Sequence, residues 1–172
     1  MPEKTLVVIK PDGVERNLTG EIIRRFQDAG LILTALRMLK VKEELVARHY
    51  PLDPEYCRTI GEKSAAAGEK IADPEAHGRM IVNGLRKYLT NGPVVALVLT
   101  GENAIKRVRE ITGYTDPAQA AKGTIRGDLG EDSILAANRE KRPCRNLIHA
   151  SGNPKEAEYE ISLWFRKEEI TG

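Results

Sequence analysis

Apolar runs bounded by charged and turn residues predict the elements at the start of the chain. Residues 6–9 form an unbroken aliphatic run, which predicts a buried strand, and residues 11–13 read Pro-Asp-Gly, which predicts a turn after it. A helix is expected next, with Thr19 as its N-cap and Gly30 in the left-handed position past its end. Strand character returns over residues 31–42.

The same patterns continue in the rest of the chain. Residues 43–50 predict a short helix, and residues 93–100 hold an apolar run that is too uniform for an exposed edge and so predicts a central strand. Residues 102–111 predict a helix closed by Gly113, and residues 147–150 predict a last short strand.

A strong helix start follows this last strand. Asn153 is placed to be the N-cap, Pro154 occupies the first helical position, and Glu156 completes a pattern resembling a capping box. The helix is expected to run to about Trp164.

Strands that alternate with helices favour an α/β (α+β) sandwich of the ferredoxin-like βαββαβ type, with one antiparallel sheet covered by helices. The length of 172 residues favours a single domain over residues 1–172. Residues 51–79 and 130–143 fit this scheme poorly, and we interpret both as surface insertions with room for a short helix each.

Charge and composition exclude several kinds of protein. Lys and Arg number 27 against 25 Asp and Glu, and aromatic content is 5%, which disfavours a nucleic-acid-binding module. Cys57 and Cys144 lie in unrelated contexts and indicate neither a disulfide framework nor a zinc site. No segment approaches the roughly 20 apolar residues of a membrane span, and no signal peptide is evident. We therefore expect a cytoplasmic protein without membrane or nucleic-acid partners.

His149 is the most informative candidate for chemistry, because it ends an apolar run just before the marked helix start. A neutral imidazole is a competent nucleophile near neutral pH, and the helix N-terminus after it would offer positive potential to an arriving phosphate. The alternative is a half-buried structural histidine, and the residue's own surroundings leave that alternative open.

Phosphate binding also needs fixed cations, and three candidates are predicted at turns: Lys10, Arg109 and Arg126. Each could instead be solvated or paired with a nearby carboxylate. The chain has no G-x-x-x-x-G-K-[ST] motif, which excludes a P-loop mechanism. Without clustered carboxylates, any Mg²⁺ would be held mainly by nucleotide phosphates, with no protein metal ligands.

Four motifs together resemble the nucleoside diphosphate kinase family. They are K-P-D-G-V at 10–14, G-Y-T-D-P at 113–117, G-T-I-R-G-D at 123–128 and R-N-L-I-H-A-S at 145–151. The resemblance covers nearly the whole chain in order, and it decides for the catalytic interpretation of His149 against the structural one.

This resemblance implies a ping-pong reaction between nucleotides. His149 would take the γ-phosphoryl group of a donor triphosphate such as ATP as phosphohistidine, and would then pass it to an acceptor diphosphate. The reaction would supply nucleoside triphosphates other than ATP, with Mg²⁺ bound to the nucleotide. The family also implies a homo-oligomer, either a hexamer or a tetramer.

The resemblance also assigns roles by motif position. Tyr50 matches an active-site tyrosine, and Glu160 matches a carboxylate that orients the histidine. The residues matching those that hold phosphates and ribose hydroxyls are Lys10, Arg109, Thr115, Arg126 and Asn146.

The chain departs from the family pattern at two residues and at the two insertions, which lie next to expected active-site elements. Ile81 and Leu85 match the positions that contact the base, but Ile81 stands where a stacking phenylalanine is expected, and Gly152 stands where an aspartate is usual. The main rival hypothesis is a catalytically impaired homologue that serves as a binding or scaffold module. The residues that argue against that rival are the intact Lys10, Arg126, Asn146 and His149.

Overall fold

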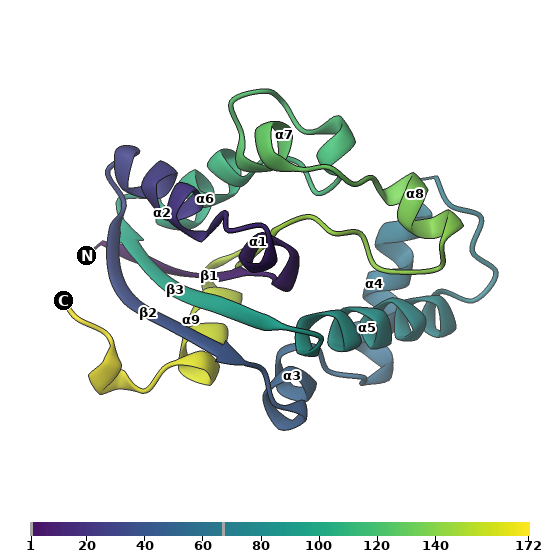
Figure 1. Ribbon diagram of the computed structural model, residues 1–172. Coiled ribbons are helices and arrows are strands. Elements are labelled where there is room, and N and C mark those ends of the chain that lie inside the picture. The colour runs from purple at the N-terminus through teal and green to yellow at the C-terminus, as the bar shows by residue number, and fades with distance from the viewer. Residues whose placement is uncertain (1, 67) are drawn as a thin grey trace. The chain divides into compact units, whose positions relative to one another are not determined.

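One antiparallel sheet organises the larger part of the molecule. Its strands lie in the order β2-β3-β1-β4 (Figure 1). The strands are β1 (Glu3–Ile9), β2 (Ile32–Lys40), β3 (Pro93–Gly101) and β4 (Ile148–Ala150). The computed structural model describes residues 2–66 and 68–172, and the chain separates into a first unit, Met1–Lys40 with Gly92–Gly172, and a second unit, Val41–Asn91.

Helices cover both faces of the sheet in the first unit. The helices α2 and α6 lie on one face and α9 on the other (Figure 1). The helices of this unit are α1 (Pro11–Glu15), α2 (Thr19–Asp28), α6 (Ala104–Thr112), α7 (Ile125–Leu129), α8 (Ile134–Arg139) and α9 (Pro154–Trp164), with 3₁₀ turns at Pro117–Gln119 and Lys167–Glu169. In the described part of the chain, no helix has both the length and the apolar character needed to cross a membrane.

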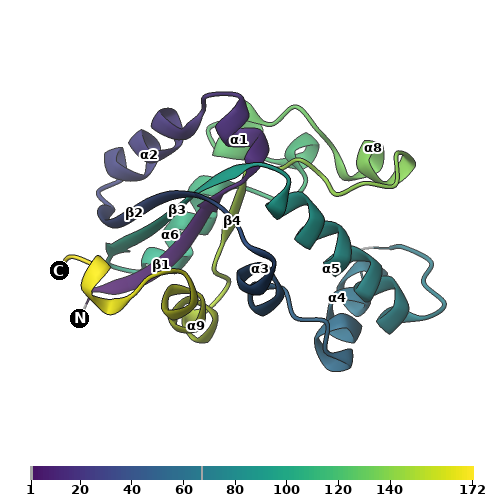
Figure 2. The same ribbon diagram turned by 60° about the horizontal axis from the view of Figure 1, so that its bottom comes forward.

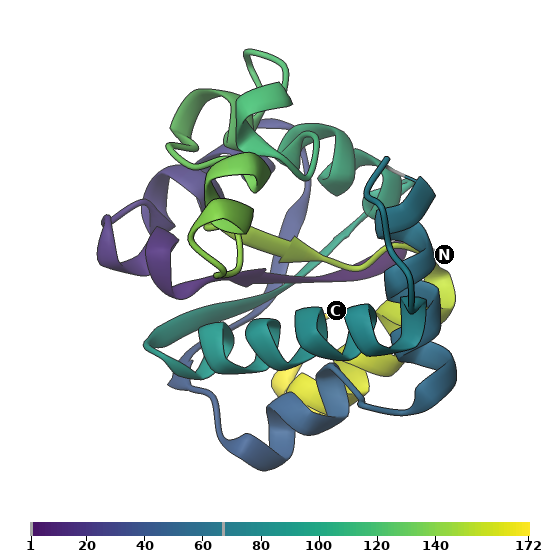
Figure 3. The ribbon, with the colours of Figure 1, turned by 90° about the vertical axis from the view of Figure 1, so that its right-hand side faces the viewer.

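Strand alternation determines which side chains face which helices. Val7 and Ile9 of β1 belong to a fully buried core that includes Phe26 of α2 and Val108 of α6. Side chains of neighbouring strand residues point to opposite faces, so Val8 faces the α9 side. The short strand β4 lies beside β1 at the edge of the sheet, with His149 directly opposite Val8 (Figure 3). His149 therefore shares the α9 face.

The second unit is helical and consists of α3 (Glu43–His49), α4 (Pro54–Ala66) and α5 (Pro74–Thr90). The last two run alongside each other (Figure 2). They approach closely because two glycines leave no side chain between them. An added Cβ at Gly78 would lie 1.7 Å from the Cys57 carbonyl oxygen, and one at Gly61 would lie 1.9 Å from the Pro74 carbonyl oxygen.

The sequence prediction of the fold class is confirmed, since the antiparallel sheet with its helices has the ferredoxin-like arrangement. The predicted strands and most helices are present, Gly30 and Gly113 have positive φ values of 79° and 88°, and Asn153 caps α9 by accepting from the Glu156 amide. The central position predicted for residues 93–100 is also correct, because β3 lies between β2 and β1.

Three local predictions were wrong. Residues 11–13 form the helix α1 rather than a turn, because Pro11 at the first position favours a helical start. Thr19 is already helical, and the N-cap is Leu18, which makes no side-chain cap bond. The long helix α5 passes the predicted insertion boundary at 79, because Asp73 caps it and Pro74 begins it.

Candidate active site

His149 is held by a carboxylate from the helix that packs on its face of the sheet. Its Nε2 lies 2.9 Å from Glu160 Oε1, and Ser151 Oγ donates to Glu160 Oε2 at 2.6 Å. The Ser151 hydroxyl also accepts from the Leu6 amide of β1 at 3.3 Å, so this polar chain is anchored to the sheet. The His149 side chain keeps 19% of its surface exposed, while that of Glu160 keeps 10%.

This contact selects the tautomer of the imidazole. A carboxylate accepts hydrogen bonds, so Nε2 carries the proton and Nδ1 carries the lone pair. The carboxylate belongs to the middle of α9, a helix that starts at a well-defined cap, where Asn153 Oδ1 accepts from the Glu156 amide at 2.9 Å. The Glu156 carboxylate reaches back to accept from the Gly152 amide at 2.9 Å, so the residue that departs from the family pattern takes part in the cap.

Asn146 connects three of the predicted phosphate-binding residues. Lys10 Nζ donates to Asn146 Oδ1 at 2.7 Å, and Asn146 Nδ2 donates to the Thr115 carbonyl at 3.0 Å. The Asn146 carbonyl accepts from Arg126 Nε at 3.0 Å. Lys10, Thr115, Arg126 and Asn146 are therefore joined in one hydrogen-bonded group.

The environment of Lys10 alters its acidity. Burial and, to a smaller extent, the nearby Arg126 guanidinium lower the pKa of Lys10 from 10.5 to about 8, while the Asp12 carboxylate opposes the shift. A buried ammonium beside an arginine creates a site of concentrated positive potential. Such a site favours an anionic ligand.

Arg126 lies in the short helix α7, not at a turn as predicted, and backbone carbonyls occupy much of its guanidinium. Besides the bond from Nε to the Asn146 carbonyl, Nη2 donates to the Ile148 carbonyl at 2.6 Å and Nη1 donates to the Gly113 carbonyl at 3.1 Å. Arg126 is only 9% exposed. It therefore clamps the backbone that leads to His149.

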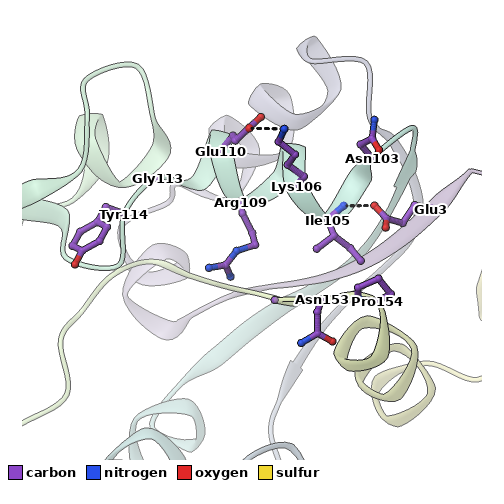
Figure 4. A pocket seen from close by; sticks show the side chains of 11 residues that line it. Glu3, Asn103, Ile105, Lys106, Arg109, Glu110, Gly113, Tyr114, Asn153 and Pro154 are labelled. Carbon is purple, nitrogen blue, oxygen red and sulfur yellow. Dashed lines mark hydrogen bonds and ion pairs between the residues drawn. The ribbon is translucent and has the colours of Figure 1, made fainter. Parts of the chain in front are cut away.

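Arg109 differs in nearly every respect. It lies on the helix α6 rather than at a turn, and it is exposed. Its side chain lines an open cavity of about 680 Å³ between α6 and the start of α9, together with Tyr114, Asn153 and Pro154 (Figure 4). Across the described residues, no hydrogen bond or ion pair involves the Arg109 guanidinium. Thr115, which follows the cavity-lining residue Tyr114, is also exposed.

The other three predicted residues belong to the second unit. Tyr50 is the C-cap residue that follows α3, and its carbonyl accepts from Arg86 Nε of α5 at 2.7 Å. Ile81 and Leu85 lie one turn apart on α5 and are both half-buried, so their side chains lie on the same helix face.

The carboxylates near the first-unit residues are already engaged by the backbone. Asp12 Oδ2 accepts from the Leu147 amide at 3.1 Å, and Asp116 Oδ1 accepts from the Ala118 amide at 3.1 Å. Divalent cations of the Mg²⁺ type prefer several oxygen ligands in a regular arrangement. Asp12 and Asp116 therefore use part of their acceptor capacity on backbone amides.

Two residues with clear structural roles were given none by the sequence. Ser151 supports Glu160, and Asp12 holds the Leu147 amide. Both lie inside the motifs that carry the family resemblance, two residues from His149 and from Lys10 respectively. That proximity is the signal that could have identified them.

Comparison with known proteins agrees with this geometry. The model of the family described as "Nucleoside diphosphate kinase" matches residues 3–56 and 72–170. A nucleoside diphosphate kinase of Pyrobaculum aerophilum is 46% identical, with 98% of this chain and 97% of the relative covered.

Solved structures show the same similarity. The crystal structure of an NDP kinase from Pyrobaculum aerophilum matches with a TM-score of 0.94 and 44% identity over 100% of both chains. A transition state mimic of the nucleoside-diphosphate kinase from Borrelia burgdorferi, with bound vanadate and ADP, matches with a TM-score of 0.83 and 35% identity, covering 99% of this chain and 91% of the other. The chain therefore belongs to the nucleoside diphosphate kinase family and is an enzyme with that activity.

Proposed function

We propose that the kinase reaction of this chain proceeds through a phosphoryl group carried on His149 Nδ1. The observation that supports this most directly is the chain from Ser151 through Glu160 to His149 Nε2. It keeps the proton on Nε2, leaves the nucleophilic lone pair on Nδ1, and stabilises the positive charge that the ring gains when Nδ1 becomes bonded.

Each half of the proposed reaction balances. In the first, Nδ1 of His149 forms a bond to the γ-phosphorus of a triphosphate while the bond to the bridging β,γ-oxygen breaks, and the diphosphate leaves with that electron pair. In the second, a terminal oxygen of another diphosphate attacks the same phosphorus, and the bond to Nδ1 breaks. The transferred group is stabilised mainly by positioning and by positive charge.

Three cations are proposed to supply that charge from different positions. Lys10 and Arg126 form a fixed pair within the Asn146 network. Arg109 is exposed and is proposed to close on the phosphates of an arriving nucleotide. Thr115 and Asn146 are proposed to contact phosphate or ribose oxygens, and Mg²⁺ is proposed to arrive with the nucleotide.

The second unit is proposed to contact the nucleotide as well. Ile81 and Leu85 present apolar surface from one face of α5, which suits van der Waals contact with any base rather than recognition of one. Tyr50 is proposed as a further contact. An aliphatic residue at 81 stacks less well than an aromatic ring, so we expect weaker binding of all bases rather than a new preference.

A homo-oligomer is proposed on the basis of one exposed apolar strip. The edge strand β2 leaves Leu36 and Met38, which lie two residues apart on the same face of the sheet, exposed by 50% and 59%. Neighbouring exposed apolar residues on an unpaired strand favour association, so we propose a second copy of this chain as the partner there. Hexamer and tetramer are both compatible with such a contact, and light scattering of the purified protein distinguishes them.

Labelling with ATP carrying ³²P in the γ-position tests the phosphohistidine. We expect label on the protein that is lost in acid and kept in base, and that moves to GTP when GDP is added. His149→Ala should abolish the label, whereas His77→Ala, a half-buried histidine of the second unit, should keep it. Acid-stable label, or label that persists in His149→Ala, would refute the proposal, and a wild-type protein without label would favour the scaffold hypothesis.

A further inference from the structure

The backbone just before His149 adopts an unusual conformation. Leu147 has a φ of 70°, a value that leucine rarely takes, and its side chain is fully buried. The Ile148 amide donates to the Asn146 carbonyl at 2.8 Å, so residues 146–148 form a three-residue γ-turn centred on Leu147. A γ-turn with positive φ at its centre is strained, and such conformations persist only when surrounding contacts enforce them.

Contacts from three sides enforce this turn. Asp12 Oδ2 accepts from the Leu147 amide at 3.1 Å, and the Lys10 amide donates to the Leu147 carbonyl at 2.8 Å. The Arg126 guanidinium holds the carbonyls on either side of Leu147. Among these contacts, the bond from Asp12 is the one in which a side chain holds the amide of Leu147, the central residue of the turn.

The turn connects the phosphate-binding group to the nucleophile. Asn146, which receives Lys10 Nζ, lies at one end of the turn, and His149 follows its other end directly. A change at Leu147 would therefore move both groups together. Displacing a reacting group by about 1 Å can lower a rate about a hundredfold.

We propose that Asp12 is a positioning residue, which acts through the Leu147 amide to hold His149 in line with the phosphoryl group. This inference rests on the proposed role of His149. It requires an acceptor at position 12, not a negative charge, because the Leu147 amide only needs an oxygen to which it can donate. The competing explanation is electrostatic, since the Asp12 carboxylate also lies close enough to influence the Lys10 ammonium.

Single-turnover labelling with saturating Mg-ATP separates the two explanations. Asp12→Ala removes the acceptor, and we expect phosphoenzyme formation to slow about 10-fold to 100-fold while KM for ATP changes much less. Asp12→Asn keeps an acceptor oxygen in the same volume, and we expect a rate within about fivefold of the wild type. Glu15→Ala, which removes an exposed carboxylate from the same helix, is the matched control and should leave the rate unchanged.

Several outcomes would overturn the inference. A wild-type rate in Asp12→Ala would do so, as would a rise in KM with the rate unchanged. A loss in Asp12→Asn as large as that in Asp12→Ala would assign the effect to charge, and because asparagine fills the same space it decides the question even where the alanine variant does not fold. His149→Ala in the same assay separates this inference from the proposed function. If label persists in His149→Ala, the proposed function is refuted. If His149→Ala loses the label while Asp12→Ala forms the phosphoenzyme at the normal rate, only this inference is refuted.

Discussion

Arg126 and Arg109 have the same predicted role but contrasting surroundings. Arg126 is 9% exposed, and three of its nitrogens donate to the carbonyls of Gly113, Asn146 and Ile148. Arg109 is exposed on α6, and the described residues supply no partner for its guanidinium. One arginine is therefore built into the backbone around His149, while the other remains available to a ligand.

The contrast separates two ways in which a cation can serve phosphoryl transfer. A buried clamp contributes fixed charge and fixed geometry, because its position is set before the nucleotide arrives. An exposed arginine contributes binding, because it forms its hydrogen bonds only when the nucleotide brings phosphate oxygens. Removing the first should affect folding and catalysis together, and removing the second should affect mainly nucleotide affinity.

The largest effect is expected from Arg126→Ala. The variant leaves three buried or partly buried carbonyls without their charged donor, so we expect the free energy of unfolding to fall by about 3–5 kcal/mol. Turnover should fall about a hundredfold to a thousandfold. Arg126→Lys should restore little, because one ammonium cannot reproduce the planar set of donors. Denaturant unfolding and steady-state kinetics measure both effects, and an unchanged stability would contradict the clamp.

A smaller and different effect is expected from Arg109→Ala. Losing a charge-assisted contact to phosphate should raise KM for ATP about tenfold or somewhat more, with little change in the melting temperature. Lys106→Ala, one turn earlier on α6 and paired with Glu110, is the control and should change neither quantity. A fall in stability comparable to that of Arg126→Ala would erase the contrast between the two arginines.

The kcat/KM of the enzyme should also depend on pH through the buried residue Lys10. Burial and Arg126 lower the pKa of Lys10 to about 8, with Asp12 and Cys144 acting in the opposite sense, so its charge is lost as the pH rises through that value. We expect kcat/KM to fall about tenfold per pH unit above this midpoint, since kcat/KM reports the free enzyme. Lys10→Arg should remove this limb, and a profile that is flat to pH values near 10 in the wild type would show that Lys10 titrates normally.

The same shift has an opposite consequence for stability. The unfolded chain, with the ordinary lysine pKa of 10.5, binds more protons than the folded chain between about 8 and 10.5. The contribution of Lys10 to the free energy of unfolding therefore rises with pH in this window. Comparing wild type with Lys10→Met by denaturant unfolding across the window isolates it.

The smallest effect is expected at Asn153, which lines the open cavity beside Arg109. Asn153→Ala removes the cap of α9 and should lower the free energy of unfolding by about 1 kcal/mol. Turnover should stay within about threefold of the wild type, because Glu160 lies in the middle of the helix rather than at its frayed end. A much larger loss of turnover would mean that the cap of α9 positions Glu160. The cavity beside Arg109, which Asn153 lines, would then be coupled to the Glu160–His149 contact.

Sequence could predict the fold well because its signals here are local. The aliphatic runs of β1 and β3 and the Asn153-Pro154 start of α9 each report on neighbouring residues only. The helix α1 was missed because Pro-Asp-Gly suits both a turn and a first helical turn.

The candidate site was less accessible to sequence because its contacts are long-range. The family motifs named the residues, but no local pattern indicates that Arg126 binds carbonyls some twenty positions away. The positive φ of Leu147 was equally hidden, since leucine gives no signal for it, unlike the glycines at 30 and 113.

The pairing of β4 with β1 also bears on how the protein is made. Lys10 and Asn146, which share a hydrogen bond, are separated by 136 positions, so the ribosome must deliver nearly the whole chain before they can meet. Until β4 emerges, β1 has an unpaired edge, and a nascent chain in that state is exposed to intermolecular pairing. The residues proposed to carry out the reaction are therefore among the last parts of the molecule to be assembled, and chains that terminate before residue 145 lack Asn146 and His149 and are expected to have no phosphotransferase activity.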